Sequence, residues 1–159
     1  MLFRSMKIQF KALILVVAIL GNIALLFKAN ATFKGNMSVR IDGLKNQKGQ
    51  VCLNIFSTSK GFPNNNNQAV KARCVKAAKN SITVNFPDLN AGSYAVAVIH
   101  DVNGDNTLNR NALSIPTEGF GFSNNPKILT GPPKFAESAV FIAGSNTDIQ
   151  VQLQYFLGG

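Results

Sequence analysis

Alternation of apolar and polar residues with a period of two is the feature that most constrains the fold of this chain. It is clearest over residues 149–155, where Ile149, Val151, Leu153 and Tyr155 are separated by glutamines. Successive side chains of a β-strand point to opposite faces, so such a run buries one face and leaves the other in water. Because no sustained stripe of helical period accompanies it, we predict an all-β fold.

Six further runs are predicted to be strands. Residues 94–99 are apolar at every position, as expected of a central strand that is covered on both faces. The others are 37–41, 51–56, 70–76, 82–86 and 139–143. Turn-forming residues separate these runs at short intervals. About seven strands in one domain predict a single Greek-key β-sandwich of immunoglobulin-like or transthyretin-like type.

A short motif before the central run supports a Greek-key sandwich. Leu89, Gly92 and Tyr94 form the pattern L-x-x-G-x-Y. Glycine permits a tight crossover, and the tyrosine hydroxyl can bond back to the backbone across the corner, as in a tyrosine corner. The alternative is a core tyrosine after an ordinary turn.

The N-terminus has the pattern of a secretory signal peptide. Arg4, Lys7 and Lys11 precede an apolar run at 12–27, and an A-x-A site ends at Ala31. We therefore predict a signal peptide over 1–31, a domain over 32–159, and an exported protein that is periplasmic or secreted. The alternative is an uncleaved anchor at 12–27, although that run is shorter than the roughly 20 residues of a spanning helix.

The positive charge of the chain belongs partly to this segment. The formal net charge of +9 falls to +5 without residues 1–31, which hold four basic residues and no acid. The remaining basic residues form no long run and are dense only over 71–79. A nucleic-acid site needs clustered basic residues with stacking aromatics nearby, so nucleic acid is not an expected partner.

The two cysteines are predicted to form a disulfide. Pairing 51–56 with 70–76 as antiparallel neighbours places Cys52 opposite Cys74, and an even cysteine count in an exported domain favours a bridge. Closing a loop of this size stabilises a fold by roughly 3 kcal/mol. The alternative is a pair of buried thiols; a metal site lacks ligand spacing.

A polar loop over 100–125 follows the central strand and holds a candidate calcium site. Its oxygen donors alternate as in calcium-binding loops, which use six to eight hard ligands. The candidate ligands are Asp101, Asn103, Asp105, Thr107 and Asn109. Two departures weaken the match: Asn106 stands at the position of a glycine, and Ala112 at that of a bidentate glutamate. The alternative is a turn held by side-chain to backbone bonds.

The same loop allows an enzyme hypothesis. His100 is the single histidine, and Glu118 is its candidate partner in a hydrolase-type site, which predicts a pocket joining the two side chains. No G-x-S-x-G or H-E-x-x-H motif accompanies them. The alternative is a hydrogen-bonded histidine that braces the end of a strand.

Phenylalanines in glycine-rich segments are candidate ligand contacts. Phe120 and Phe122 alternate with glycines, and Phe62 and Phe135 lie in comparable settings. An exposed ridge of these rings could stack on a sugar or a peptide. The alternative is that the rings plug an open end of the sandwich.

Two motifs resemble those of a known family. The chain reads HDVNGD from His100 and PTEGFGFSNN from Pro116, and together with GLKNQKGQVCLNIF, SKGFP and GPPKF these resemble the exported bacterial domain-of-unknown-function family 2141. The resemblance implies a small exported β-sandwich in the style of transthyretin-like and carboxypeptidase regulatory-like domains. It supplies no catalytic residue. In that family an acid often stands where Asn109 stands here, which weakens the calcium hypothesis.

Together these observations predict a non-catalytic exported module with a binding or structural role in the cell envelope. Its expected partner is an envelope component, either a polysaccharide or a protein. Contact with a membrane is expected only through an uncleaved N-terminal segment, and calcium is the single candidate cofactor.

Overall fold

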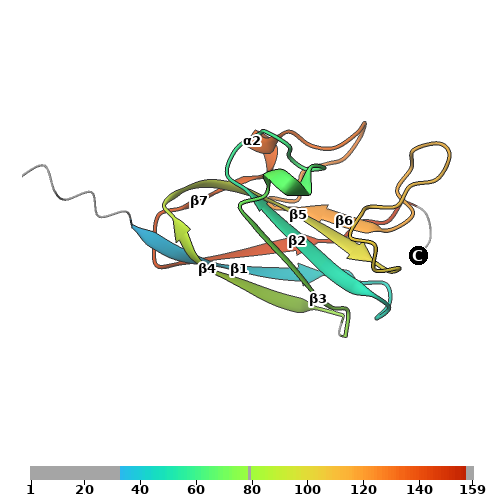
Figure 1. Ribbon diagram of the computed structural model, residues 1–159, viewed down its shortest axis with the longest axis horizontal. Helices are drawn as coiled ribbons and strands as arrows, with labels where there is room; N and C mark the ends of the chain where they lie inside the picture. Colours follow the sequence, from blue (N-terminus) through green and yellow to red (C-terminus); the bar gives the residue numbers. More distant parts are fainter. Residues whose placement is uncertain (1–32, 79, 157–159) are drawn as a thin grey trace, which may run out of the picture. The chain divides into compact units, whose positions relative to one another are not determined.

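The computed structural model describes residues 33–78 and 80–156 of the chain. The predicted signal peptide or anchor at 1–31 lies outside these residues. The described part is a sandwich of two β-sheets with eight strands, which confirms the predicted all-β fold (Figure 1). Among the helices of this part, none has the length and apolar character needed to cross a bilayer.

The smaller sheet has three strands in the order β4-β1-β8. These are β4 (Ile82–Asn90), β1 (Lys34–Asp42) and β8 (Asn146–Gln152). Strand β1 is antiparallel to β4 and parallel to β8. Strand β8 ends before the predicted limit at residue 155, so Leu153 and Tyr155 continue the alternation outside the strand.

The larger sheet has five strands and is built around β5. Its members are β3 (Lys71–Lys76), β2 (Gln50–Phe56), β5 (Gly92–Asp101), β6 (Gly119–Phe122) and β7 (Ala139–Ile142). Strand β2 pairs with one edge of β5, while β6 and β7 share the other edge. Two short helices, η1 (Asn66–Gln68) and α2 (Phe135–Ser138), lie in the connections.

The main core lies between the two sheets. Alternate residues of β1, β2 and β5 supply it, and Met37, Val39, Leu53 and Ile55 are fully buried. Burial of one such side chain stabilises a fold by roughly 1.5–3 kcal/mol. The period-two pattern of the sequence is therefore the pattern of this core.

A second apolar cluster lies on the opposite face of the larger sheet. It contains Phe56, Ala97, Phe120 and Phe122, with Phe62 and Phe135 packed at its edge. Even-numbered residues of β5 face the main core and odd-numbered residues face this cluster. This arrangement explains why residues 94–99 are apolar at every position, and it confirms the prediction of a central strand covered on both sides.

Strand β6 was not predicted, because its alternation uses glycine as the inward residue. A Cβ atom on Gly119 would overlap the ring of Tyr155, and one on Gly121 would lie 2.7 Å from Cγ1 of Val151. The glycines thus allow the C-terminal segment to cross close beneath β6. Phe120 and Phe122 point to the other face, so the predicted loop over 100–125 is shorter and gives way to a strand at Gly119.

The predicted corner and disulfide are both present. The Tyr94 hydroxyl donates a hydrogen bond to the Asn90 carbonyl at 2.9 Å, and Gly92 adopts a φ of 154° that other residues rarely take. Cys52 lies opposite Cys74 in the β2–β3 register, and the two are joined by a disulfide. The period-two register of the sequence was sufficient to predict this bridge.

We predict that Gly119→Ala lowers the free energy of unfolding by about 1–3 kcal/mol, because the new methyl group must displace the Tyr155 ring. Urea unfolding followed by far-ultraviolet circular dichroism measures the change. Gly144→Ala is the matched control, since a Cβ atom there has only one neighbour, at 4.0 Å. Equal effects of the two substitutions would contradict the close-approach role of Gly119.

Candidate ligand site

The polar loop after β5 is organised by the carboxylate of Asp101, which is fully buried. Its Oδ1 accepts hydrogen bonds from the backbone N–H groups of Gly104 at 2.7 Å and Asp105 at 3.2 Å. Its Oδ2 accepts from the backbone of Asn106 at 2.9 Å and from Nε2 of Gln50 at 2.8 Å. One charged side chain thus folds the loop around the end of the strand.

Asp105 is the second acid of this loop and is held on its surface. Its carboxylate accepts from the backbone and hydroxyl of Thr107 and from the side-chain amides of Asn103 and Asn109. The hydrogen bond from the Thr107 hydroxyl is the largest of the effects that hold the pKa of Asp105 well below its usual range. Three of the predicted calcium ligands therefore donate to Asp105.

Glu118 reaches back to the same loop. Its two oxygens accept from the backbone N–H groups of Val102 at 2.8 Å and Asn109 at 3.0 Å. Among the predicted ligands, Asn109 Oδ1 is buried without a hydrogen-bond partner in the described part of the chain. Within residues 33–78 and 80–156, no three His, Cys, Asp or Glu side chains form a group that could hold a metal ion.

The calcium hypothesis remains untested by this arrangement and stays a prediction. The bonds made by Asp101, Asp105 and Glu118 are those of the alternative, a loop held by side-chain to backbone hydrogen bonds. A calcium ion would have to share these carboxylates with the N–H donors that they already accept.

His100 lies on the inner side of the sandwich and is fully buried. Its Nε2 donates to the Lys48 carbonyl at 2.9 Å, because a carbonyl can only accept, and its Nδ1 lies 2.7 Å from the Tyr155 hydroxyl. Burial is the main cause that raises the pKa of Tyr155. Both ring nitrogens of His100 therefore form hydrogen bonds to other segments of the chain, one to Lys48 and one to Tyr155.

The S-N-N sequence after β6 also makes structural bonds. The Ser123 hydroxyl accepts from the Val96 N–H at 2.9 Å, and the Ser123 N–H donates to the Val96 carbonyl. Val96 lies between the part of β5 that pairs with β7 and the part that pairs with β6, so Ser123 fills the gap between these two strands. Asn125 binds the outer edge of β8 at Gln150 and Gln152. The motif that carries the family resemblance therefore specifies packing of the strands.

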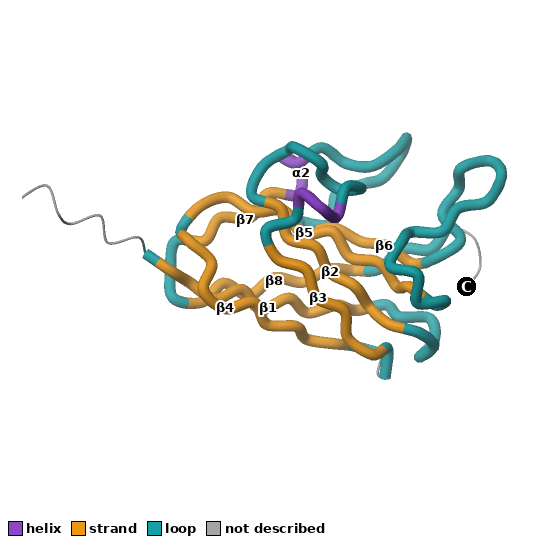
Figure 2. The backbone as a smooth tube through the Cα atoms, in the orientation of Figure 1, coloured by secondary structure: helices purple, strands orange, loops and turns teal. Residues whose placement is uncertain are grey.

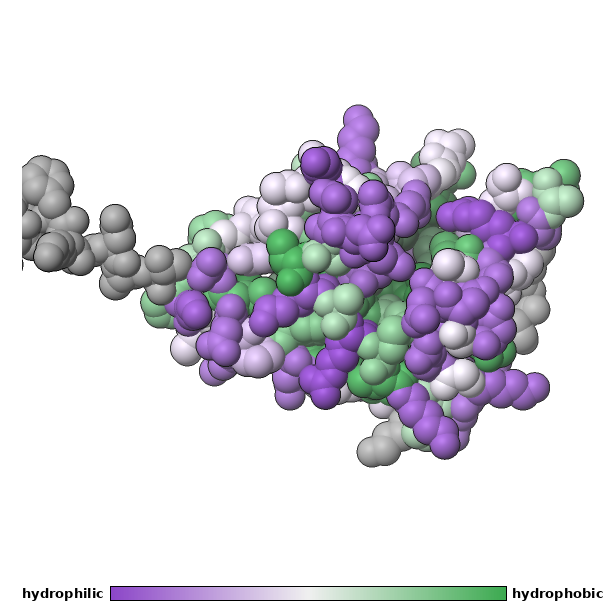
Figure 3. All heavy atoms as spheres, viewed as in Figure 1, coloured by the Kyte–Doolittle hydropathy of each residue, from purple (hydrophilic) through white to green (hydrophobic). Residues whose placement is uncertain are grey.

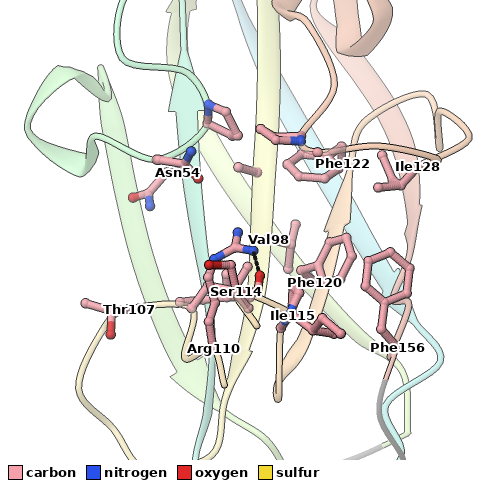
Figure 4. Close-up of a pocket in the computed structure, with 18 of the residues that line it drawn as sticks. Asn54, Val98, Thr107, Arg110, Ser114, Ile115, Phe120, Phe122, Ile128 and Phe156 are labelled. Atoms are coloured by element: carbon pink, nitrogen blue, oxygen red, sulfur yellow. Dashed lines mark hydrogen bonds between the residues drawn. The ribbon is translucent and has the colours of Figure 1, made fainter. Parts of the chain in front are cut away.

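A pocket of about 700 Å³ lies over the outer face of β5 and β6. Its apolar wall includes Ile115, Phe120, Phe122, Leu129 and Phe156, as Figure 4 shows for those that it labels. Three connections, drawn as teal loops in Figure 2, meet around it: β2–β3, β5–β6 and the segment after β6. In Figure 3 apolar surface shows in a hollow between polar lobes.

Asparagines connect two of these loops across the rim of the pocket. Asn54 of β2 donates through Nδ2 to Oδ1 of Asn66 at 2.8 Å, and Asn66 donates to the Asn106 carbonyl at 3.2 Å. The β2–β3 and β5–β6 loops are thus joined by hydrogen bonds. The asparagine tract that the sequence showed as a loop forms part of this rim.

The predicted site residues lie in different places. Phe120 and Phe122 line the pocket but are only 4% and 7% exposed, so they do not form an exposed ridge. Their rings pack edge-on against neighbours: Phe122 against Phe62, and Phe120 against Phe156. Neither His100 nor Glu118 is among the lining residues, so the pocket is not the one expected from the enzyme hypothesis.

Several lining residues were missed by the sequence analysis, among them Asn54, Arg110, Ile115, Leu129 and Phe156. They come from separate loops and have no mutual spacing that could indicate a shared site. Leu129 is a partial indication of this surface in the sequence, because it is an apolar residue in a loop rich in glycine and proline.

Comparisons with known proteins identify the family. The model of the family described as "Uncharacterized protein conserved in bacteria (DUF2141)" matches residues 39–150, and the chain belongs to this family. A comparison with curated proteins finds no match.

Among solved structures, the chain is similar to a fimbrial assembly protein from Parabacteroides distasonis ATCC 8503, with 9% identity and a TM-score of 0.40. The match covers 77% of this chain and 53% of that one. At this distance the likeness says nothing about the function of this chain.

We predict that Asp101→Ala lowers the melting temperature equally with calcium and with a chelator, because the lost acceptors serve backbone N–H groups. A decrease in stability of at least about 3 kcal/mol is expected from several unpaired donors. Differential scanning fluorimetry of the wild type and the variant measures both. If calcium raises the melting temperature of the wild type only, the loop is an ion site. Should the variant not fold, Asp105→Asn provides the same comparison at an exposed position.

We also predict that Tyr155→Phe lowers the free energy of unfolding by about 1–3 kcal/mol, because the buried Nδ1 of His100 loses its partner. Urea unfolding measures this change. Tyr155→Phe keeps the ring that contacts Gly119, so packing is preserved. A variant as stable as the wild type would show that the His100–Tyr155 bond contributes nothing.

Proposed function

We propose that the chain is an exported, non-catalytic binding module that holds an apolar group of an envelope component in the pocket over β5 and β6. The observation that carries this proposal is the pocket itself, with a volume of about 700 Å³ and a wall of phenylalanine and aliphatic side chains. Ligand pockets in proteins are typically concave, mostly apolar and of about this size.

The chemistry of the other polar residues supports binding over catalysis. Asp101, Glu118 and His100 are buried, and the polar atoms of each side chain form hydrogen bonds within the protein. A general base or nucleophile needs an atom that can reach a substrate. The pocket, in contrast, has lining residues with free surface, since Phe156 is 49% exposed and Leu129 is 87% exposed.

An apolar group fits this wall better than a sugar ring. Sugars stack on an open aromatic face, whereas Phe120 and Phe122 are buried and expose little of their ring surface to solvent. The rim amides of Asn54 and Asn66 are bonded to each other and to the Asn106 carbonyl. Between the two predicted partner classes, polysaccharide and protein, this favours a partner that presents an apolar side chain or an acyl chain.

The test uses the neutral fluorescent probe N-phenylnaphthylamine and protein purified after export of the full chain. We expect saturable binding that Phe156→Ala weakens about tenfold, because a contact of the wall is lost. Phe141→Ala is the matched control, since Phe141 is 64% exposed, lies on β7 and is not one of the lining residues. Equal binding by both variants, or no saturable binding at all, would contradict the proposal.

A further inference from the structure

The pocket has one strongly polar feature that the apolar wall does not explain. Among its described lining residues, Arg110 is the single charged side chain and no acid is present. Its guanidinium forms no ion pair with an acid of the described residues, where the ion pair present is Arg40–Asp42. An arginine beside an apolar wall therefore has unused capacity for an anion.

The position of Arg110 is fixed by its own loop. Its Nη1 donates to the Ser114 carbonyl at 3.0 Å, an interaction drawn as a dashed line in Figure 4. A β-bridge pairs Arg110 with Pro116, and Asn111 and Ile115 close the loop: the Asn111 N–H donates to the Ile115 carbonyl, and Asn111 Oδ1 accepts from the Ile115 N–H. A guanidinium has five N–H donors, so one bond to Ser114 leaves most of them for a ligand. A side chain that is already oriented loses less entropy when it binds.

Two exposed leucines accompany the pocket. Leu129 is one of its lining residues, and Leu113, which is not, lies in the Arg110 loop with 78% of its surface exposed. Apolar residues of this exposure gain free energy when a ligand covers them. The pocket thus combines an apolar wall with one cation, which is the complement of a molecule with one apolar chain and one anionic group.

We propose that the pocket binds a single-chain amphiphile with one anionic headgroup, the chain lying against Phe120, Phe156 and Ile115 and the headgroup at Arg110. This inference rests on the proposed binding function and names its ligand class. Arginine is weakly hydrated and pairs with carboxylate or phosphate through two parallel hydrogen bonds, so either headgroup fulfils the requirement.

The experiment measures displacement of N-phenylnaphthylamine by decanoate, decyl phosphate and the neutral counterpart decanol. We expect Arg110→Gln to weaken displacement by the anions about tenfold and by decanol less than about twofold, since only the anions lose a charged partner. Decanoate binding by the wild type is also expected to weaken as the salt concentration rises. The two anions distinguish a carboxylate from a phosphate source.

The control is Arg73→Gln, the same change at an arginine of β3 that does not line the pocket. Unchanged decanoate affinity in Arg110→Gln, or an equal loss in Arg73→Gln, would overturn the inference while leaving the binding function intact. Failure of the neutral probe to bind the wild type would overturn the binding function itself. Binding to phosphatidylglycerol vesicles without binding of soluble anions would also overturn the inference and assign the exposed leucines to a membrane surface.

Discussion

The burial of β5 on both faces is the constraint on which the rest of the structure depends. Its even-numbered residues complete the core between the sheets, and its odd-numbered residues form the floor of the outer cluster. A shift of one residue would exchange the two sets, so the register is strongly specified. One edge of β5 is shared by β6 and β7, and Ser123 satisfies the backbone of Val96 between them.

The polar residues near the end of β5 follow from this constraint. A central strand must end with its last backbone groups satisfied, and Asp101 does this by folding the next residues around its carboxylate. Glu118 and Ser123 perform the corresponding task where the chain returns as β6. The polar motifs of this chain therefore maintain the strand connections, and the pocket lies beside them.

The strands could be predicted from the sequence because their hydrophobic period reports directly which face is buried. The same period also predicts the register that pairs Cys52 with Cys74, and the disulfide confirms it. Strand β6 was missed because Gly119 and Gly121 occupy its inward positions, where close packing replaces hydrophobicity. For Phe120 and Phe122 the sequence left two alternatives open, an exposed ridge or buried rings, because local pattern does not show that Phe62 and Phe156 pack against those rings.

The pocket could not be predicted for a different physical reason. Its residues come from three connections, and their proximity depends on loop conformations set by side-chain bonds such as Asn66 to Asn106. No residue spacing within the sequence indicates that these loops lie next to one another.

The contrast between His100 and Arg110 shows why binding is the better supported function. For His100 to accept a proton from a substrate, it would have to release Lys48 or Tyr155, and each buried group left unpaired costs about 1–3 kcal/mol. Arg110 needs no such release, because it lines the pocket and its hydrogen bond to the Ser114 carbonyl leaves other guanidinium N–H groups for a ligand. A buried and saturated group stabilises the fold, while a positioned charge with free donors is available to a ligand. This criterion supports the proposal that a ligand binds at the outer face of β5 and β6, with the conspicuous polar motif as part of the framework that holds this face in place.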